Sequence, residues 1–226
     1  MAIANFTDLS VTIADWLNRA DLDQKIPDFI LLAESSLNKA LRHSRMVSTT
    51  SLSLSANTQK VAIPADFLEP IYAQAANDPD NAMEQVSAQQ LIIMRRNRLR
   101  SSGSPKFFAI LGRFLEVAPI PTVVTQIDLT YYQAIPALSA GSPTNWLLTY
   151  DPDIYLYTAL LHAAPFLKDD ARAAVYDNLV TKQIVSAVKG HQTATFDNLK
   201  VPGFTLDAPA DAPKNPVGGS GPLGGS

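Results

Sequence analysis

Side chains that could act as bases, nucleophiles or metal ligands are few and scattered in this sequence. The histidines are His43, His162 and His191, and none has a second ligand at the spacing of a metal-binding helix. His43 falls at a predicted helix end and His162 on an apolar helix, so packing or the helix dipole accounts for both. Neither a glycine-rich phosphate loop nor a GxSxG turn occurs. The sequence therefore predicts no catalytic residue, no metal site and no cofactor.

Several carboxylates lie beside prolines or at predicted helix starts, where a capping role explains them: Asp66, Asp151, Asp153, Asp169 and Asp170. A hydrolytic site assembled from scattered acidic residues would leave no pattern in the sequence. A hydrolase, such as a cell-wall-degrading enzyme, is therefore kept as a third hypothesis, although no motif supports it.

Arginines gather at one place in the chain, at Arg95, Arg96, Arg98 and Arg100. Such a cluster could line a channel that carries DNA, or meet an acidic partner. It could equally be a solvated helix end that complements the helix dipole, or an inter-subunit contact. The net charge of −3 gives no global reason to bind nucleic acid. A DNA-binding packaging or ejection protein is thus the alternative function.

The composition is that of an ordinary globular protein. The 226 residues are 46% hydrophobic and 17% charged, enough for one domain or for two small ones. Cysteine is absent, which excludes disulfides and thiolate sites. The start of the chain lacks the pattern of a secretory signal, and its longest apolar stretch is far shorter than the roughly 20 residues of a membrane span. We expect no membrane partner.

Apolar residues at helical spacing predict helices in residues 1–45 and 141–192. Asp8 is the expected cap of the first helix, and Pro27 suits the first turn of the second. Asp151 with Pro152 opens a later helix that Pro165 kinks or stops. Asp169 is expected to open the last helix, which should end near Gly190.

Polar and apolar residues alternate between these helices, which predicts an inserted antiparallel β domain over residues 46–140. Residues 50–55 should turn at Asn57 and pair with residues 61–63. Gly112 marks the clearest hairpin, and residues 127–132 should add a strand to the same sheet. Ser87 is expected to cap a short helix. The fold class is therefore α+β, a helical bundle with an inserted sheet.

Two further segments carry apolar residues whose role the sequence leaves open. Trp146, Leu147 and Leu148 precede a proline-started helix and belong either to the core or to a subunit interface. Residues 193–226 are rich in Pro, Gly, Ala and Asp and cannot form a core of their own. Their apolar side chains are candidates for docking onto neighbouring chains: Phe196, Leu199, Val201, Phe204 and Leu206.

Several ordered motifs together resemble a known family. Residues 63–69 (IPADFLE) are similar to an element of many phage virion proteins. Residues 131–139 (YYQAIPALS), 143–148 (PTNWLL), 152–157 (PDIYLY) and 159–170 follow in the same order. Over roughly residues 9–190 the chain resembles the head-to-tail adaptor proteins of tailed phages, related in kind to the tail tubular or gatekeeper subunits of short-tailed phages.

This resemblance implies a non-enzymatic structural subunit, made in the host cytoplasm and located in the neck of the virion. Such adaptors assemble as rings, typically of twelve copies, between the portal and the tail nozzle. They extend the DNA channel and help to retain the genome. The implied partners are copies of the chain, the portal protein, the tail nozzle proteins and, non-specifically, genomic DNA. The family has no catalytic residues to carry over, and the segment after Thr193 lies outside the shared pattern.

Overall fold

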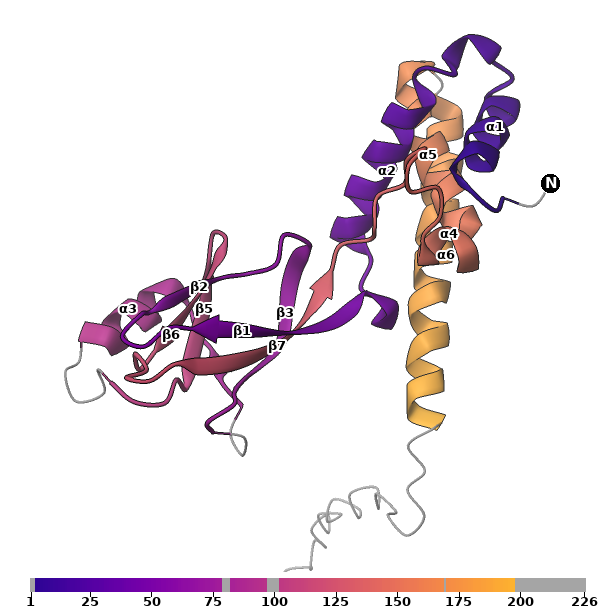
Figure 1. Ribbon diagram of the computed structural model, residues 1–226. Coiled ribbons are helices and arrows are strands. Elements are labelled where there is room, and N and C mark those ends of the chain that lie inside the picture. The colour runs from indigo at the N-terminus through magenta and orange to yellow at the C-terminus, as the bar shows by residue number, and fades with distance from the viewer. Residues whose placement is uncertain (1–2, 79–81, 97–101, 169, 198–226) are drawn as a thin grey trace, which may run out of the picture.

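The chain folds into two bodies, a helical bundle and a β body that projects from its side (Figure 1). The computed structural model describes residues 3–78, 82–96, 102–168 and 170–197. Helices from both ends of the chain form the bundle, and the strands between them form the β body. The predicted α+β class, with a sheet inserted between helices, is confirmed.

The bundle is organised around one central helix. Its members are α1 (Phe6–Leu17), α2 (Ile26–Ala40), α4 (Trp146–Tyr150), α5 (Pro152–Phe166) and α6 (Asp170–Asp197), with 3-10 turns η1 (Ala20–Leu22) and η2 (Ser44–Met46). Helix α5 contacts each of the other four. Its residues are apolar on every side, as expected of a helix that is buried all round, and Tyr155 and Leu160 are fully buried.

The ends of the helices correct two predictions and confirm two others. Asn5, not Asp8, caps α1: its side chain accepts a hydrogen bond from the Asp8 N–H over 2.9 Å. Pro27 lies in the first turn of α2, and Pro165 lies one residue before the end of α5, as predicted. The predicted end of α6 near Gly190 is wrong, since the helix continues to Asp197. One internal glycine costs only about 1 kcal/mol, which does not by itself end a helix. Asp169 lies outside the described residues.

The β body consists of two small sheets and one helix. One sheet has the order β1-β7-β3, formed by β1 (Val47–Leu54), β7 (Thr125–Gln133) and β3 (Phe67–Ala75). The other has the order β2-β6-β5-β4, formed by β2 (Lys60–Ala62), β6 (Phe114–Ala118), β5 (Phe107–Leu111) and β4 (Glu84–Gln85). Helix α3 (Ala88–Arg96) packs on the second sheet, and Ser87 caps it as predicted.

The strand partners differ from the predicted ones. The β5–β6 hairpin forms at Gly112, whose φ of 61° suits a glycine. Strand β7, however, belongs to the other sheet, and β1 pairs with β7 rather than with β2. Asn57 does make the predicted turn, with a φ of 58°. The turn sends the chain from one sheet to the other, and Leu54 before it and Val61 after it pack into the same β core.

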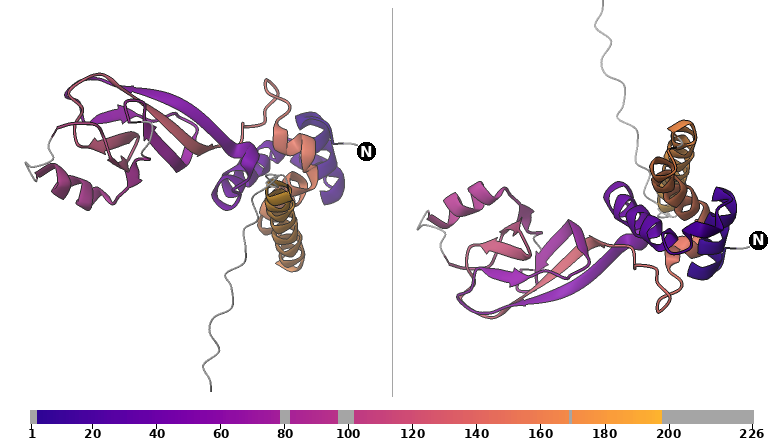
Figure 2. Two further views of the ribbon diagram at one scale, coloured as in Figure 1. Left: turned by 90° about the horizontal axis from the view of Figure 1, so that it is seen from below. Right: turned by 90° about the horizontal axis from the view of Figure 1, so that it is seen from above.

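The two bodies have separate hydrophobic cores. The bundle core includes Leu37 and Leu160, the β core includes Leu115 and Ile127, and no buried residue belongs to both. Residues 41–46 and 134–145 connect the bodies, and Figure 2 shows how narrow this junction is. Around it, Arg42 forms an ion pair with Glu69 at 2.8 Å and lies over the Tyr132 ring at 5.7 Å.

Candidate interaction surfaces

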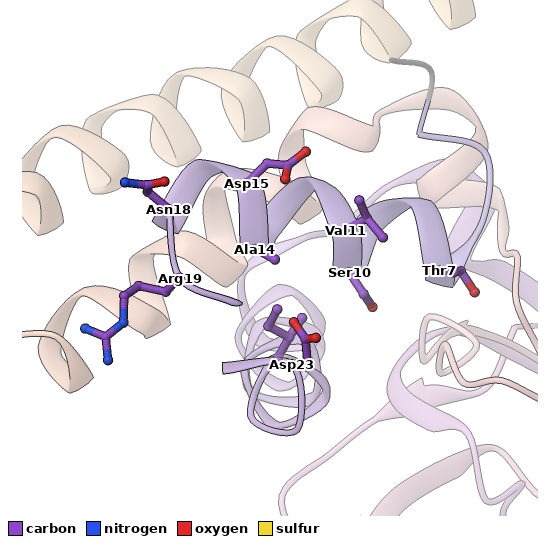
Figure 3. A pocket seen from close by; sticks show the side chains of 9 residues that line it. Thr7, Ser10, Val11, Ala14, Asp15, Asn18, Arg19 and Asp23 are labelled. Atoms are coloured by element: carbon purple, nitrogen blue, oxygen red, sulfur yellow. The ribbon is translucent and has the colours of Figure 1, made fainter. Parts of the chain in front are cut away.

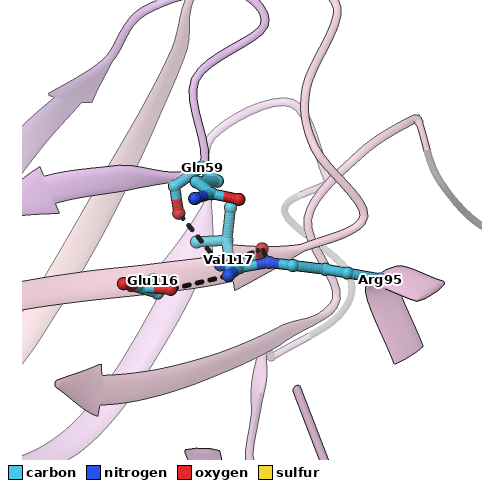
Figure 4. Close-up of polar contacts among 4 residues, drawn as sticks. All are labelled: Gln59, Arg95, Glu116 and Val117. Carbon is cyan, nitrogen blue, oxygen red and sulfur yellow. Dashed lines mark hydrogen bonds and ion pairs between the residues drawn. The ribbon is translucent and has the colours of Figure 1, made fainter. Parts of the chain in front are cut away.

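The arginine cluster does not form one exposed patch in the part of the chain that the structure describes. Arg95, at the end of α3, donates to Glu116 Oε2 over 2.6 Å and to the Val117 carbonyl oxygen over 3.0 and 2.9 Å. It also donates to the Gln59 carbonyl oxygen over 3.2 Å, and Figure 4 shows the guanidinium reaching all three residues at once. The Arg95 and Glu116 side chains are only 14% and 16% exposed. Arg95 therefore ties α3 to β6 and to the segment before β2.

The rest of the cluster is placed differently. Arg96, the next residue, is exposed to solvent. Arg98 and Arg100 lie outside the described residues. A charge that is paired and nearly buried is not available to a phosphate, so Arg96 is the described member of the cluster that could contact DNA.

Leu147 and Leu148 belong to the bundle core, where each is 1% exposed. Helix α4 begins here because the Asn145 side chain accepts a hydrogen bond from the Leu148 N–H over 2.9 Å. Trp146 is partly buried, and its ring stacks on the buried His43 ring at 5.3 Å. Of the two interpretations that the sequence left open for this segment, the placement supports the core.

The two histidines whose side chains are described, His43 and His162, pack within the fold. His162 Nε2 lies 2.8 Å from the Ser36 hydroxyl, which joins α5 to α2, and burial lowers the pKa of His162. His43 Nδ1 accepts a hydrogen bond from the Arg45 N–H over 3.1 Å at the domain junction. His191 lies in the last part of α6, where side chains are not described. Within the described ranges, no three His, Cys, Asp or Glu side chains are grouped as metal ligands.

A buried polar network fastens the linker 134–145 to the bundle. Glu34, only 5% exposed, accepts hydrogen bonds from the Leu138 N–H over 2.7 Å and from the Tyr155 hydroxyl over 3.2 Å. Asn145 donates to the Tyr155 oxygen over 2.7 Å. Burial raises the pKa of Glu34, and the two hydrogen bonds oppose that shift in part. The network holds the return path from β7 against α2 and α5.

Sequence reasoning missed this network, although a signal was present. Glu34 falls within the helical stripe of α2 that otherwise carries only apolar residues, with Ile30, Ala33 and Leu37 as neighbours on the buried face. A carboxylate in such a position must find hydrogen-bond donors when the helix is buried. Its partners lie more than 100 residues away in the sequence, and no local pattern could have named them.

Exposed apolar side chains occur on several bundle helices, among them α1, α2 and α6. On α2, Leu31 and Leu32 are 63% and 49% exposed, and on α1, Trp16 is 47% exposed. On α6, Val175 and Val185 are 56% and 44% exposed. The Trp16 ring packs edge-on against Tyr157, and the next residue, Leu17, belongs to the core.

An open hollow of ≈ 540 Å³ lies between α1 and the start of α2 (Figure 3). One wall is a single face of α1 with mostly small or polar side chains, and Asp23 and Ile26 contribute the other wall. Arg19 at its rim is paired with Asp21 through two hydrogen bonds of 2.6 and 2.7 Å. The lining holds two carboxylates, Asp15 and Asp23, without a histidine or a paired nucleophile, so it resembles a surface groove rather than an active site.

The tail residues singled out in the sequence fall largely beyond what can be described. Phe196 is in α6, at a point where side chains are not described. Leu199, Val201, Phe204 and Leu206 lie outside the described residues. Their interpretation as a docking segment stays a prediction.

Comparison with known proteins identifies the family. A family model for the SU10 adaptor protein matches residues 4–200, a range that covers both bodies of the fold. No curated protein matches the chain. In the described part of the chain, no helix is both long enough and apolar enough to cross a bilayer. The chain therefore belongs to the SU10 adaptor protein family and is a phage head-to-tail adaptor, as the sequence motifs predicted.

Proposed function

We propose that this adaptor is the subunit of a ring, typically of twelve copies, that joins the portal to the tail nozzle and lines the DNA channel. Its family implies a structural component of the virion neck that associates with other head and tail proteins, and favours a non-enzymatic role. The ring, its partners and its part in genome retention are what we propose beyond the family assignment.

The observation that supports the ring is the exposure of apolar side chains on different helices of the bundle. Leu31 and Leu32 on α2 are exposed on one helix, and Val175 and Val185 on another, α6. Helices α2 and α6 both pack against α5. A ring needs a heterologous contact, in which one face of a subunit meets a different face of the next copy. Exposed apolar side chains on two different helices of the bundle are suited to such an asymmetric contact.

Contacts with the other partners are proposed for segments outside the bundle core. The exposed Arg96 on the β body is a candidate for non-specific contact with DNA in the channel. The segment after Gly190 is a candidate for docking to the portal or to neighbouring copies. Because the described core residues all precede Gly190, we expect removal of that segment to leave the fold intact and to weaken docking.

The test is assembly of the purified full chain with its portal, viewed by electron microscopy. We expect rings seated on one end of the portal. Leu31→Ser with Leu32→Ser should abolish the rings, because it removes one of the proposed apolar contacts. The fold should stay intact, because these side chains contribute little to the core. A matched control, Val123→Ser with Val124→Ser, removes two residues that are 59% and 64% exposed on the β body and should leave rings intact. A wild-type chain that stays monomeric and does not bind the portal would refute the proposal.

A further inference from the structure

One sheet edge of the β body is long and regular, unlike the other sheet edges that the structure describes. Strand β1 pairs with β7 through an uninterrupted register of eight residues and forms the end of its sheet. Within the described chain, the Val47 N–H donates to the Ser44 carbonyl oxygen, and residues 48–54 make no backbone hydrogen bond outside the pairing with β7. Alternate residues of an edge strand point their N–H and C=O groups outward, so roughly four residues of β1 present unpaired groups.

The composition of β1 lacks the features that usually protect such an edge. Its sequence, VSTTSLSL, contains no charge, no proline and no glycine. Natural edge strands are commonly short, charged, bulged or interrupted by proline, because a long regular edge is a template for another strand. An edge of this kind is suited to receive an added strand.

The other described edges are protected. Strand β3 contains Pro70, which has no N–H, and its register shifts twice. Part of its outer side is covered, since the Met83 N–H donates to the Ala73 carbonyl over 2.8 Å. Strands β2 and β4 have three and two residues. The contrast makes β1 the edge that the described fold leaves available.

We propose that the β1 edge receives residues 199–206 of a neighbouring copy as an added strand. This inference rests on the proposed ring. A second copy offers few other strands, because its β2 and β4 are too short and its β3 edge is protected. Pairing β1 with β1 in antiparallel fashion would give a two-fold dimer, which does not continue around a ring. A terminal segment placed on the next copy's edge is a heterologous contact that does continue.

The sequence after α6 suits this role. Leu199 and Val201 are two residues apart, as are Phe204 and Leu206, so each pair can face the β core side of the sheet, where Leu52 and Leu54 lie. Pro202 and Gly203 fall between the pairs, where a bulge would bring both onto one face. The nine residues from 198 to 206 can span about 30 Å when extended.

The absence of cysteine from the chain allows a clean cross-linking test in assembled rings. Ser53→Cys, on the exposed face of β1, is combined with a cysteine at each position from 203 to 207 in turn. After oxidation, we expect ladders of covalently linked copies, strong at every second tail position, because alternate residues of a strand face the same way. Tyr72→Cys on the protected β3 strand, 41% exposed, is the matched control and should give no ladder.

The outcomes separate this inference from the proposed function. Rings that form but give no ladder, an equal ladder from the β3 control, or links confined within single chains would each overturn the added strand while leaving the ring intact. If the wild-type chain forms no rings, the proposed function fails first. As a second measure, Phe204→Ser with Leu206→Ser should speed amide exchange in residues 47–54 of assembled rings at least tenfold, and unchanged exchange would contradict the inference.

Discussion

The Arg95 contacts allow a quantitative test of how the β body is stabilised. Removing one partner of a buried ion pair costs roughly 3–5 kcal/mol, whereas an exposed pair contributes less than about 1 kcal/mol. The Arg95 and Glu116 side chains keep 14% and 16% of their exposure, so the buried case is the closer one. We expect Arg95→Met to lower the free energy of unfolding of the β body by about 3 kcal/mol. Methionine retains much of the apolar stem, so the loss reports the polar contacts.

Urea unfolding followed by two signals would measure this loss. The two tryptophans of the chain, Trp16 and Trp146, both lie in the bundle, so their fluorescence follows that body alone. Far-ultraviolet circular dichroism follows both bodies. At an m-value of roughly 1.5 kcal/mol/M, the variant should unfold its β body about 2 M earlier in urea. The fluorescence midpoint should stay where it is, because the two cores share no buried residue.

Arg96→Met is the matched control, since the neighbouring arginine is exposed. It should shift neither signal by more than about 0.5 kcal/mol. If Arg95→Met moved the dichroism midpoint as little as this control does, the ion pair would have to be treated as a weak surface contact. If both signals moved together, the bundle and the β body would unfold as one unit, contrary to the separation of their cores.

Three further predictions follow from the same contacts. Burial raises the pKa of Glu34 above its ordinary value of 4.5, so the folded chain holds this proton more tightly than the unfolded chain. The stabilisation is present at low pH and is lost as pH rises through the raised pKa. Glu34→Gln should remove this pH dependence from the urea midpoint measured by fluorescence. An unchanged pH dependence would contradict the prediction. Leu148→Ala should cost about 2–5 kcal/mol in urea unfolding and Leu31→Ala less than about 0.5 kcal/mol, whereas equal losses would contradict their placement. In gel shifts, Arg96→Ala should weaken DNA binding and Arg95→Met should not, and the reverse order would refute the assignment of the exposed arginine.

The helices could be predicted from sequence because their signals are local. Leu9, Ile13 and Leu17 recur at helical spacing, and Pro152 and Pro165 mark the two ends of α5. Errors arose where two local signals compete. Asn5 and Asp8 are both capping residues, and the earlier one caps α1 while the Asp8 carboxylate accepts from the Ala4 N–H over 3.2 Å. The sequence alone could not rank them.

The strand pairing could not be predicted because its partners are distant. The sequence shows that residues 50–55 alternate, but their partners in β7 lie more than 70 positions later. A turn such as that at Asn57 fixes the local direction of the chain, not the sheet that the next strand joins. The same limit applies to the interaction surfaces. Arg95 looked like one member of a basic cluster, and only the fold reveals that Glu116 neutralises it.

The junction between the two bodies has a mechanical consequence for an adaptor. The Arg42–Glu69 pair is 34% and 56% exposed, and such a pair contributes no more than about 1 kcal/mol. The connecting segments 41–46 and 134–145 are held more firmly, because Leu41, Met46, Ile135 and Leu138 lie in the bundle core. In the proposed ring, a load on the β body would therefore pass into the bundle through these two anchored segments rather than through the exposed ion pair.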